Sequence, residues 1–277
     1  MKMEESEYMG YDGTQMFMRV WSPQQQPKAV LLGFHGLGSH SGLISHVGEF
    51  FANSGYLFYA PDMRGFGHYS GIKGHVDSFE EYNKDMESLV AFIKLKHPSL
   101  KLFLYGHSLG ALWIVLYVME YQEGIDGILL PSLAVSERLK IGTATRSIMK
   151  VLSKANVKKH FDTGLDLDLI ARNPEVVKRN KEDPLRFDMV TPRMAAEGLA
   201  ARARAFANAQ LVTVPVFVLQ PSEDLILIPE ENKNYFDRIA SKDKTWKQYD
   251  GLYHEPFQDE GGDELLKDMA AWLDERT

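Results

Sequence analysis

The sequence predicts an α/β fold, with a mainly parallel central sheet flanked by helices and one inserted helical segment. Short continuous apolar runs alternate with amphipathic segments, a pattern typical of strands buried on both faces between covering helices. The alternation stops at about residue 132 and resumes after residue 211. We therefore expect an N-terminal core part (residues 1–131), an inserted helical cap (132–211) and a C-terminal core part (212–277).

The first part of the chain predicts a hairpin followed by a β-α-β unit. The Asp12-Gly13 pair separates two strand-like runs and tolerates the positive φ angles of a hairpin turn. Next come a buried strand over 29–34, a helix over 43–53 and a strand over 56–60, which Pro61 ends.

A second helix is predicted from Ser78 to the residue before Pro98. Glu81 stands at the capping-box offset from Ser78. The apolar residues expected on one side of this helix are Leu89, Phe92, Ile93 and Leu95.

Further strands are predicted over 101–105 and 125–130, on either side of another apolar helix. Between 132 and 211 the segments are rich in Lys, Arg and Ala and contain no convincing buried strand. After them come a strand over 214–219, a helix following Pro229 and a strand over 244–249. The last helix carries the apolar residues Leu265, Leu266, Met269 and Trp272.

Composition excludes several classes of function. The chain has 277 residues, 44% of them hydrophobic, which is enough for one large core with an appendage. It has no cysteine, so disulfides, thiolate metal sites and cysteine nucleophiles are excluded. A net charge of −7 without a basic stripe argues against nucleic acid as a partner.

No targeting or anchoring segment is expected. The acidic N-terminus lacks the apolar centre of a secretory signal. No apolar run approaches the roughly 20 residues of a membrane span. We expect a cytoplasmic protein, with peripheral membrane association as a further option.

The pentapeptide Gly106-His107-Ser108-Leu109-Gly110 lies between a predicted strand and a predicted helix. A G-x-S-x-G sequence at such a junction is typical of a nucleophile elbow, in which a strained turn exposes the serine hydroxyl. Gly106 and Gly110 allow strand and helix to approach closely. Ser108 is therefore the candidate covalent nucleophile.

A serine nucleophile needs a base and an acid that orients the base. Asp224 follows the strand over 214–219, at the sheet edge where ligands of parallel sheets converge. His254 lies beyond the final strand, in a loop bounded by glycine and proline. The order serine, acid, histidine is the one that accompanies a nucleophile elbow.

An oxyanion hole needs two N–H donors near the reacting carbonyl. The candidates are the backbone amides of Leu37, after the first buried strand, and of Leu109, after the nucleophile. His35 and Gly36 shape the same turn, and His35 is expected to fix loop hydrogen bonds rather than act as a base. His107 precedes Ser108 directly, so its side chain is not expected to face the hydroxyl.

The chain resembles the monoacylglycerol lipase and lysophospholipase family of the α/β-hydrolase superfamily, which includes serine aminopeptidase-like hydrolases. The resemblance covers nearly the whole chain. It rests on the elbow and on the segments 35–41, 61–67, 173–177, 183–185 and 251–255. Two segments depart from the family pattern: an extra residue in Gly67-His68-Tyr69-Ser70, and Leu130-Pro131-Ser132 in place of a Ser-Ala-Pro stretch.

The resemblance implies Ser108 as nucleophile, Asp224 as acid, His254 as base and a mobile lid over an acyl pocket. It implies no cofactor, and no metal is expected, since H-E-x-x-H is absent. The expected reaction is hydrolysis of a lipid ester, most simply a monoacylglycerol, with lysophospholipids as an alternative. No obligate protein partner is evident, and transient contact of the cap with a lipid interface is a further expectation.

Other substrates and another class of function stay open, because the catalytic parts do not encode the acyl group. The same machinery acts on thioesters, small aryl esters, peptides or carbon-carbon bonds. A ligand-binding relative that has lost turnover would bind its ligand and react stoichiometrically at the serine.

Overall fold

The computed structural model describes residues 1–136, 138 and 142–277. At its centre is an eight-stranded sheet in the order β1-β2-β4-β3-β5-β6-β9-β10. β1 and β2 form an antiparallel hairpin, β2 pairs antiparallel with β4, and all other pairs are parallel. The mainly parallel sheet predicted from the sequence is confirmed. Its strands are β1 (Lys2–Met9), β2 (Gln15–Ser22), β3 (Val30–Phe34), β4 (Leu57–Pro61), β5 (Leu102–Gly106), β6 (Gly127–Pro131), β9 (Val216–Pro221) and β10 (Lys244–Tyr249).

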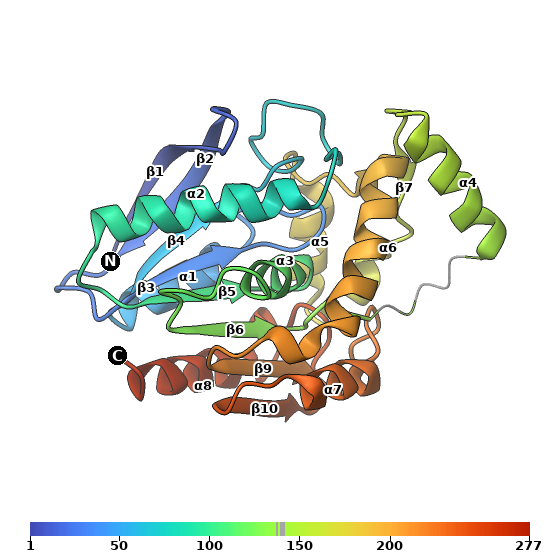
Figure 1. Cartoon of the computed structure of the whole chain (residues 1–277). Helices are drawn as coiled ribbons and strands as arrows, with labels where there is room; N and C mark the ends of the chain where they lie inside the picture. Colours follow the sequence, from blue (N-terminus) through green and yellow to red (C-terminus); the bar gives the residue numbers. More distant parts are fainter. Residues whose placement is uncertain (137, 139–141) are drawn as a thin grey trace.

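Helices cover both faces of the sheet (Figure 1). Strand residues alternate between two apolar clusters. Leu32 and Leu104 belong to the cluster shared with α2, α3 and α7, whereas Leu31 and Phe103 belong to the cluster shared with α1 and α8. Burial on both faces explains why the central strands are continuous apolar runs. The covering helices are α1 (Ser45–Asn53), α2 (Glu80–Lys96), α3 (Leu109–Val118), α7 (Pro229–Arg238) and α8 (Gly262–Asp274).

The stretch between β6 and β9 adds no strand to this sheet in its described residues. It contains α4 (Thr143–Lys154), β7 (Phe161–Asp162), η1 (Leu167–Leu169), α5 (Pro174–Glu182), β8 (Met189–Val190), α6 (Pro192–Ala207) and η2 (Ala209–Leu211). β7 and β8 pair into a small antiparallel sheet that the sequence did not predict. Two-residue strands are too short for a period of two to be recognised.

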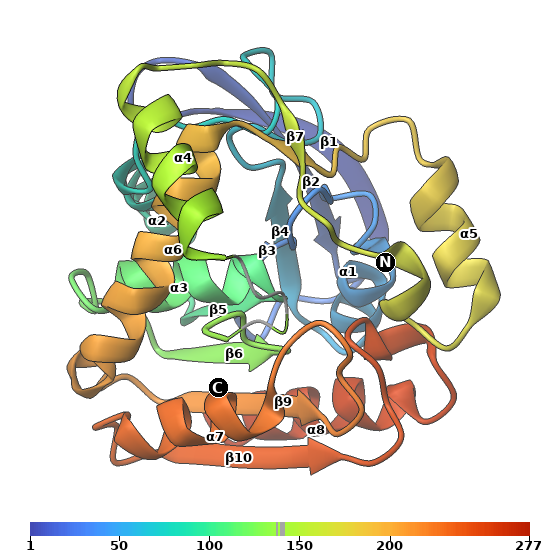
Figure 2. The ribbon, with the colours of Figure 1, turned by 90° about the vertical axis from the view of Figure 1, so that its right-hand side faces the viewer.

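These elements gather at one end of the molecule. The arrows of β6, β9 and β10 point toward α4, α6 and β7, and both termini lie at the opposite end (Figure 1). Seen from that end, α4, α5 and α6 surround the carboxyl edge of the sheet (Figure 2). We propose that residues 132–211 act as one cap; residues 137 and 139–141 of that stretch lie outside the described residues.

Two local expectations need correction. The β1–β2 loop runs from Gly10 to Thr14, longer than the Asp12-Gly13 pair, although Gly13 does have a positive φ of 81°. In α2, Leu95 is 86% exposed and does not share the buried side with Leu89. Six residues separate these two leucines, which places Leu95 about a third of a turn away around the helix.

Candidate active site

Ser108 lies in the turn between β5 and α3, with φ 55° and ψ −116°. A positive φ is uncommon for a residue with a side chain and marks strain. The neighbouring glycines make the turn possible. A Cβ on Gly106 would lie 2.6 Å from the carbonyl of Gly110, and a Cβ on Gly110 would lie 2.3 Å from the carbonyl oxygen of Phe34. Neither position has room for a side chain.

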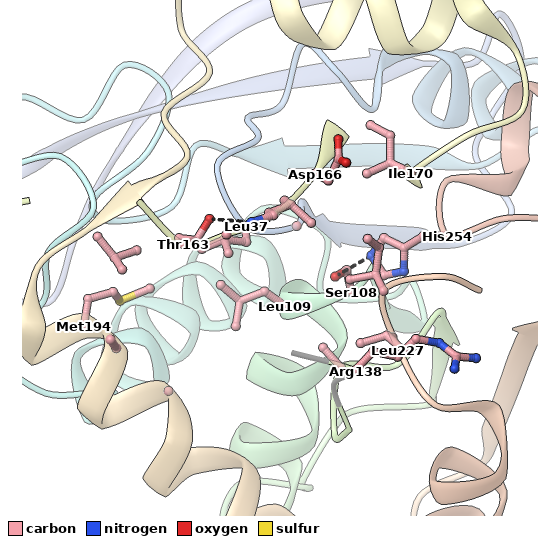
Figure 3. A pocket seen from close by; sticks show the side chains of 18 of the residues that line it. Leu37, Ser108, Leu109, Arg138, Thr163, Asp166, Ile170, Met194, Leu227 and His254 are labelled. Carbon is pink, nitrogen blue, oxygen red and sulfur yellow. Dashed lines mark hydrogen bonds between the residues drawn. The ribbon is translucent and has the colours of Figure 1, made fainter. Parts of the chain in front are cut away.

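The structure brings Ser108, His254 and Asp224 into one hydrogen-bonded chain (Figure 3 shows the first two). His254 Nδ1 lies 2.8 Å from Asp224 Oδ2, and His254 Nε2 lies 2.9 Å from Ser108 Oγ. An ionised carboxylate only accepts, so Nδ1 carries the hydrogen. In the neutral ring Nε2 then accepts from the serine hydroxyl. This is the tautomer that a general base for Ser108 requires.

The loops after the last two strands of the sheet hold the acid and the histidine. Asp224 follows β9, and its Oδ1 accepts the backbone N–H groups of Ile226 and Leu227, each at 2.8 Å. Burial raises the pKa of Asp224, but His254 and these N–H donors outweigh it, so the pKa lies below its ordinary value. Burial lowers the pKa of His254, but the Asp224 carboxylate outweighs it, so this pKa lies above its ordinary value.

Two buried side chains hold the backbone of His254. Ser132 Oγ donates to the carbonyl oxygen of His254 at 2.8 Å, and His107 Nε2 donates to the same oxygen at 2.9 Å. Ser132 follows β6 directly, is fully buried and has a positive φ of 49°. In the sequence, this segment stands out only as a departure from the family pattern. No local pattern indicates this contact, which joins residues 122 positions apart.

Leu37 and Leu109 present free backbone N–H groups beside Ser108. Leu109 is the first residue of α3, where N–H groups have no partner within the helix. Among the described residues, neither N–H forms a hydrogen bond. Both residues line the same cavity as Ser108. Their role as oxyanion donors stays a proposal.

His35 fixes the turn that carries Gly36 and Leu37. Its Nε2 accepts the backbone N–H of Met63 at 3.0 Å, so Nδ1 donates to the carbonyl oxygen of Gly36 at 2.8 Å. Burial lowers the pKa of His35 to about 4, so the ring is neutral. A Cβ on Gly36 would lie 3.3 Å from Ser108 Cβ, closer than usual. The turn therefore approaches the candidate nucleophile tightly.

A cavity of about 550 Å³ opens over Ser108 and His254 (Figure 3). Volumes of about 300–1,000 Å³ are usual for small-molecule sites. Most of its apolar wall comes from the inserted stretch, including Met149, Phe161, Leu165, Val190, Met194 and Leu199. Leu225 and Leu227, from the loop after β9, also line it. An apolar wall above a serine suits an acyl chain.

The strand-turn-helix at Ser108 and the topology of the sheet are those of an α/β-hydrolase. Residues 25–261 match the model of the family described as Serine aminopeptidase, S33. The chain belongs to this family of serine hydrolases.

Similar proteins include lipases and esterases. A monoacylglycerol lipase of Mycolicibacterium smegmatis is 30% identical over 97% of this chain and 96% of its own length. Phospholipase YtpA of Bacillus subtilis is 28% identical over 93% of this chain and 99% of its own. The crystal structure of Paleococcus ferrophilus monoacylglycerol lipase matches all of both chains with a TM-score of 0.84 and 30% identity.

Within the described parts of the chain, no helix combines the length and the apolar character needed to cross a membrane.

Proposed function

We propose that this protein hydrolyses carboxylic esters of lipids, with monoacylglycerol as the substrate that yields glycerol and a fatty acid. One observation carries the proposal: the hydrogen-bonded chain from Asp224 through His254 to Ser108 opens into a cavity with an apolar wall. The named relatives support the substrate class, since two of them are monoacylglycerol lipases about as long as this chain.

In the proposed reaction, Ser108 Oγ attacks the ester carbonyl carbon while His254 Nε2 takes the hydroxyl proton. The bond to the glyceryl oxygen breaks, and His254 returns the proton to that oxygen, which leaves an acyl-enzyme and free glycerol. Water then attacks the acyl carbon with the same histidine as base, and the fatty acid is released. Asp224 keeps the ring oriented.

The backbone N–H groups of Leu37 and Leu109 are proposed to stabilise the negative charge on the carbonyl oxygen. Each such donor typically contributes about 3 kcal/mol to the transition state. Among the described residues neither N–H group has a backbone hydrogen-bond partner, so both are available to the carbonyl oxygen of a substrate.

The cap is proposed to contact lipid transiently. On α4, Ile148 is 59% exposed and Val151 is 66% exposed. Met149 from the same helix lines the cavity. An exposed apolar helix beside the cavity suits collection of a substrate from a lipid surface.

The decisive experiment is fatty-acid release from 1-oleoylglycerol by the wild type and by Ser108→Ala. We expect a drop of about 10⁶-fold in the variant, since loss of a serine nucleophile removes the covalent route. Ser88→Ala, on α2 and away from the cavity, is the matched control. Retained activity in Ser108→Ala would show that Ser108 is not the nucleophile. An inactive wild type would show that 1-oleoylglycerol is not a substrate.

A lysophospholipase is the second candidate, favoured by the relative named as a phospholipase. Parallel assays with 1-oleoyl lysophosphatidylcholine, a short aryl ester, a thioester and an aminoacyl amide rank the substrate classes. A binding protein without turnover would label at Ser108 with an active-site probe and release no product from any of them.

A further inference from the structure

Glu255 directly follows His254 and lines the same cavity as Ser108. Its backbone N–H donates to the carbonyl oxygen of Ile170 at 2.6 Å, which ties this position to the inserted stretch. Its side chain is 18% exposed. The carboxylate therefore belongs to the interior of the site, but the reaction proposed above gives it no task.

This carboxylate lacks a hydrogen-bond donor in the described structure. Nδ1 of His107 lies 3.9 Å from Oε1, too far for a hydrogen bond, and burial lowers the pKa of that histidine. Burial raises the pKa of Glu255, but the nearby His107 and Arg186 outweigh it, so the pKa lies below its ordinary value. The group is ionised at neutral pH, and a sheltered carboxylate without donors is costly unless a ligand or water supplies them.

Arg186 does not supply the missing hydrogen-bond donor to Glu255. Its Nε donates to Asp188 Oδ2 at 2.9 Å and its Nη1 donates to Asn180 Oδ1 at 2.7 Å, so the inserted stretch holds the guanidinium. It lines the cavity, yet forms no ion pair with Glu255 within 4.0 Å. The carboxylate can therefore accept a hydrogen bond from a ligand that binds in the cavity beside Ser108.

We propose that Glu255 accepts hydrogen bonds from the hydroxyl groups of the substrate's head group and selects esters of polyols over esters of simple alcohols. A hydroxyl supplies the donor that the carboxylate lacks, and hydrogen bonds to charged groups are the stronger ones. The acyl chain then follows the apolar wall while the alcohol lies at Glu255. This inference rests on the proposed ester hydrolysis and specifies its alcohol.

The test is a cycle of two substrates and two enzymes, which isolates the coupling between side chain and hydroxyls. The value of kcat/KM is measured for 1-oleoylglycerol and for methyl oleate in the same micelles, with wild type and Glu255→Ala. We expect the ratio of glyceryl to methyl ester to fall about tenfold or more in the variant. An effect of the Glu255 charge on His254 alters both substrates alike and cancels in the ratio.

Two further variants complete the design. Glu255→Gln keeps the shape and one acceptor oxygen, so we expect a smaller fall in the ratio. Glu260→Gln removes the same charge from an exposed residue outside this cavity and is expected to leave the ratio unchanged.

An unchanged ratio in Glu255→Ala overturns the inference, even if both activities fall together. If Glu255→Ala does not fold, an unchanged ratio in the isosteric Glu255→Gln overturns it. Failure of the proposed function looks different: the wild type itself would release no oleate from 1-oleoylglycerol, whatever the residue at position 255.

Discussion

The sheet core and the inserted stretch contribute different things to one cavity. The hydrogen-bonded side chains of Ser108, Asp224 and His254 all come from loops at the carboxyl edge of the sheet. Most of the apolar wall comes from the inserted stretch. The difference suggests that the core sets what reaction occurs and that the insertion sets which substrate fits.

Packing follows the same division. Every residue of β3, β5, β6 and α3 is buried, so little can move at the elbow without disturbing the core. In α4, by contrast, most described side chains are exposed. Met194 of α6 packs into the main core, so α4 is the exposed part of the cavity wall, and a rigid site beside an exposed helix suits a fixed reaction with an adaptable pocket.

The largest effect that separates the two regions is expected from Asp224→Asn in the core. The amide presents its NH₂ group to His254 Nδ1 and favours the wrong tautomer, which typically lowers kcat about 10⁴-fold. Activity needs neutral His254, so kcat/KM falls as the pH drops through the pKa of that residue. Because the Asp224 carboxylate raises this pKa in the wild type, its acid limb lies at a higher pH than that of an ordinary histidine. In the variant the limb moves to lower pH.

Asp237→Asn is the control for loss of one carboxylate, since Asp237 pairs with Lys233 on the exposed side of α7. The measurement is a pH profile of kcat/KM with a soluble ester. An acid limb that stays in place in Asp224→Asn would show that the carboxylate does not control His254.

The strands of the core could be predicted because burial on both faces leaves an unbroken apolar run. The strand predicted over 29–34 is β3, and the one predicted over 125–130 is β6. The buried face of α2 was predicted less accurately than the core strands. Leu95 is apolar but exposed, and a helical pattern in one sequence does not show which apolar residues a neighbour covers.

Gly198→Phe in α6 is expected to have an intermediate effect, on substrate choice alone. Gly198 lines the cavity, and a Cβ placed there would meet only Phe79 Cζ, at 3.6 Å. A phenyl ring would therefore extend into the cavity. We expect kcat/KM for an oleoyl ester relative to a butyryl ester to fall about 10- to 100-fold.

Gly198→Ala is the matched control. Its methyl group fits without a clash, and alanine favours the helix over glycine by about 1 kcal/mol. We expect a small change in chain-length preference and a higher melting temperature. An equal loss of both activities in Gly198→Phe would mean that the substitution disturbs the core, which would break the division between reaction and pocket.

The candidate site could be predicted where its residues form a local sequence pattern: the glycines at the elbow, and an acid and a histidine after strands. The hydrogen bonds to the carbonyl oxygen of His254 correspond to no local pattern. Ser132 and His107 reach that oxygen only because the loops after β5, β6 and β10 meet at one edge. The pairing of loops is a property of the fold, so one sequence does not display it.

The smallest effect expected is on stability, from Ile148→Ser in α4. Ile148 is 59% exposed, so its loss should change the free energy of unfolding by no more than about 0.5 kcal/mol. Ile93→Ala in α2 is the comparison from the core, where the side chain is 1% exposed and truncation costs about 2–5 kcal/mol. Urea denaturation measures both. If Ile148→Ser costs as much as Ile93→Ala, α4 is packed like the core. Ile148→Ser can instead cost little stability and slow the hydrolysis of 1-oleoylglycerol in vesicles but not of a soluble ester. That result would mean that the apolar face of α4 contacts lipid and contributes little to folding.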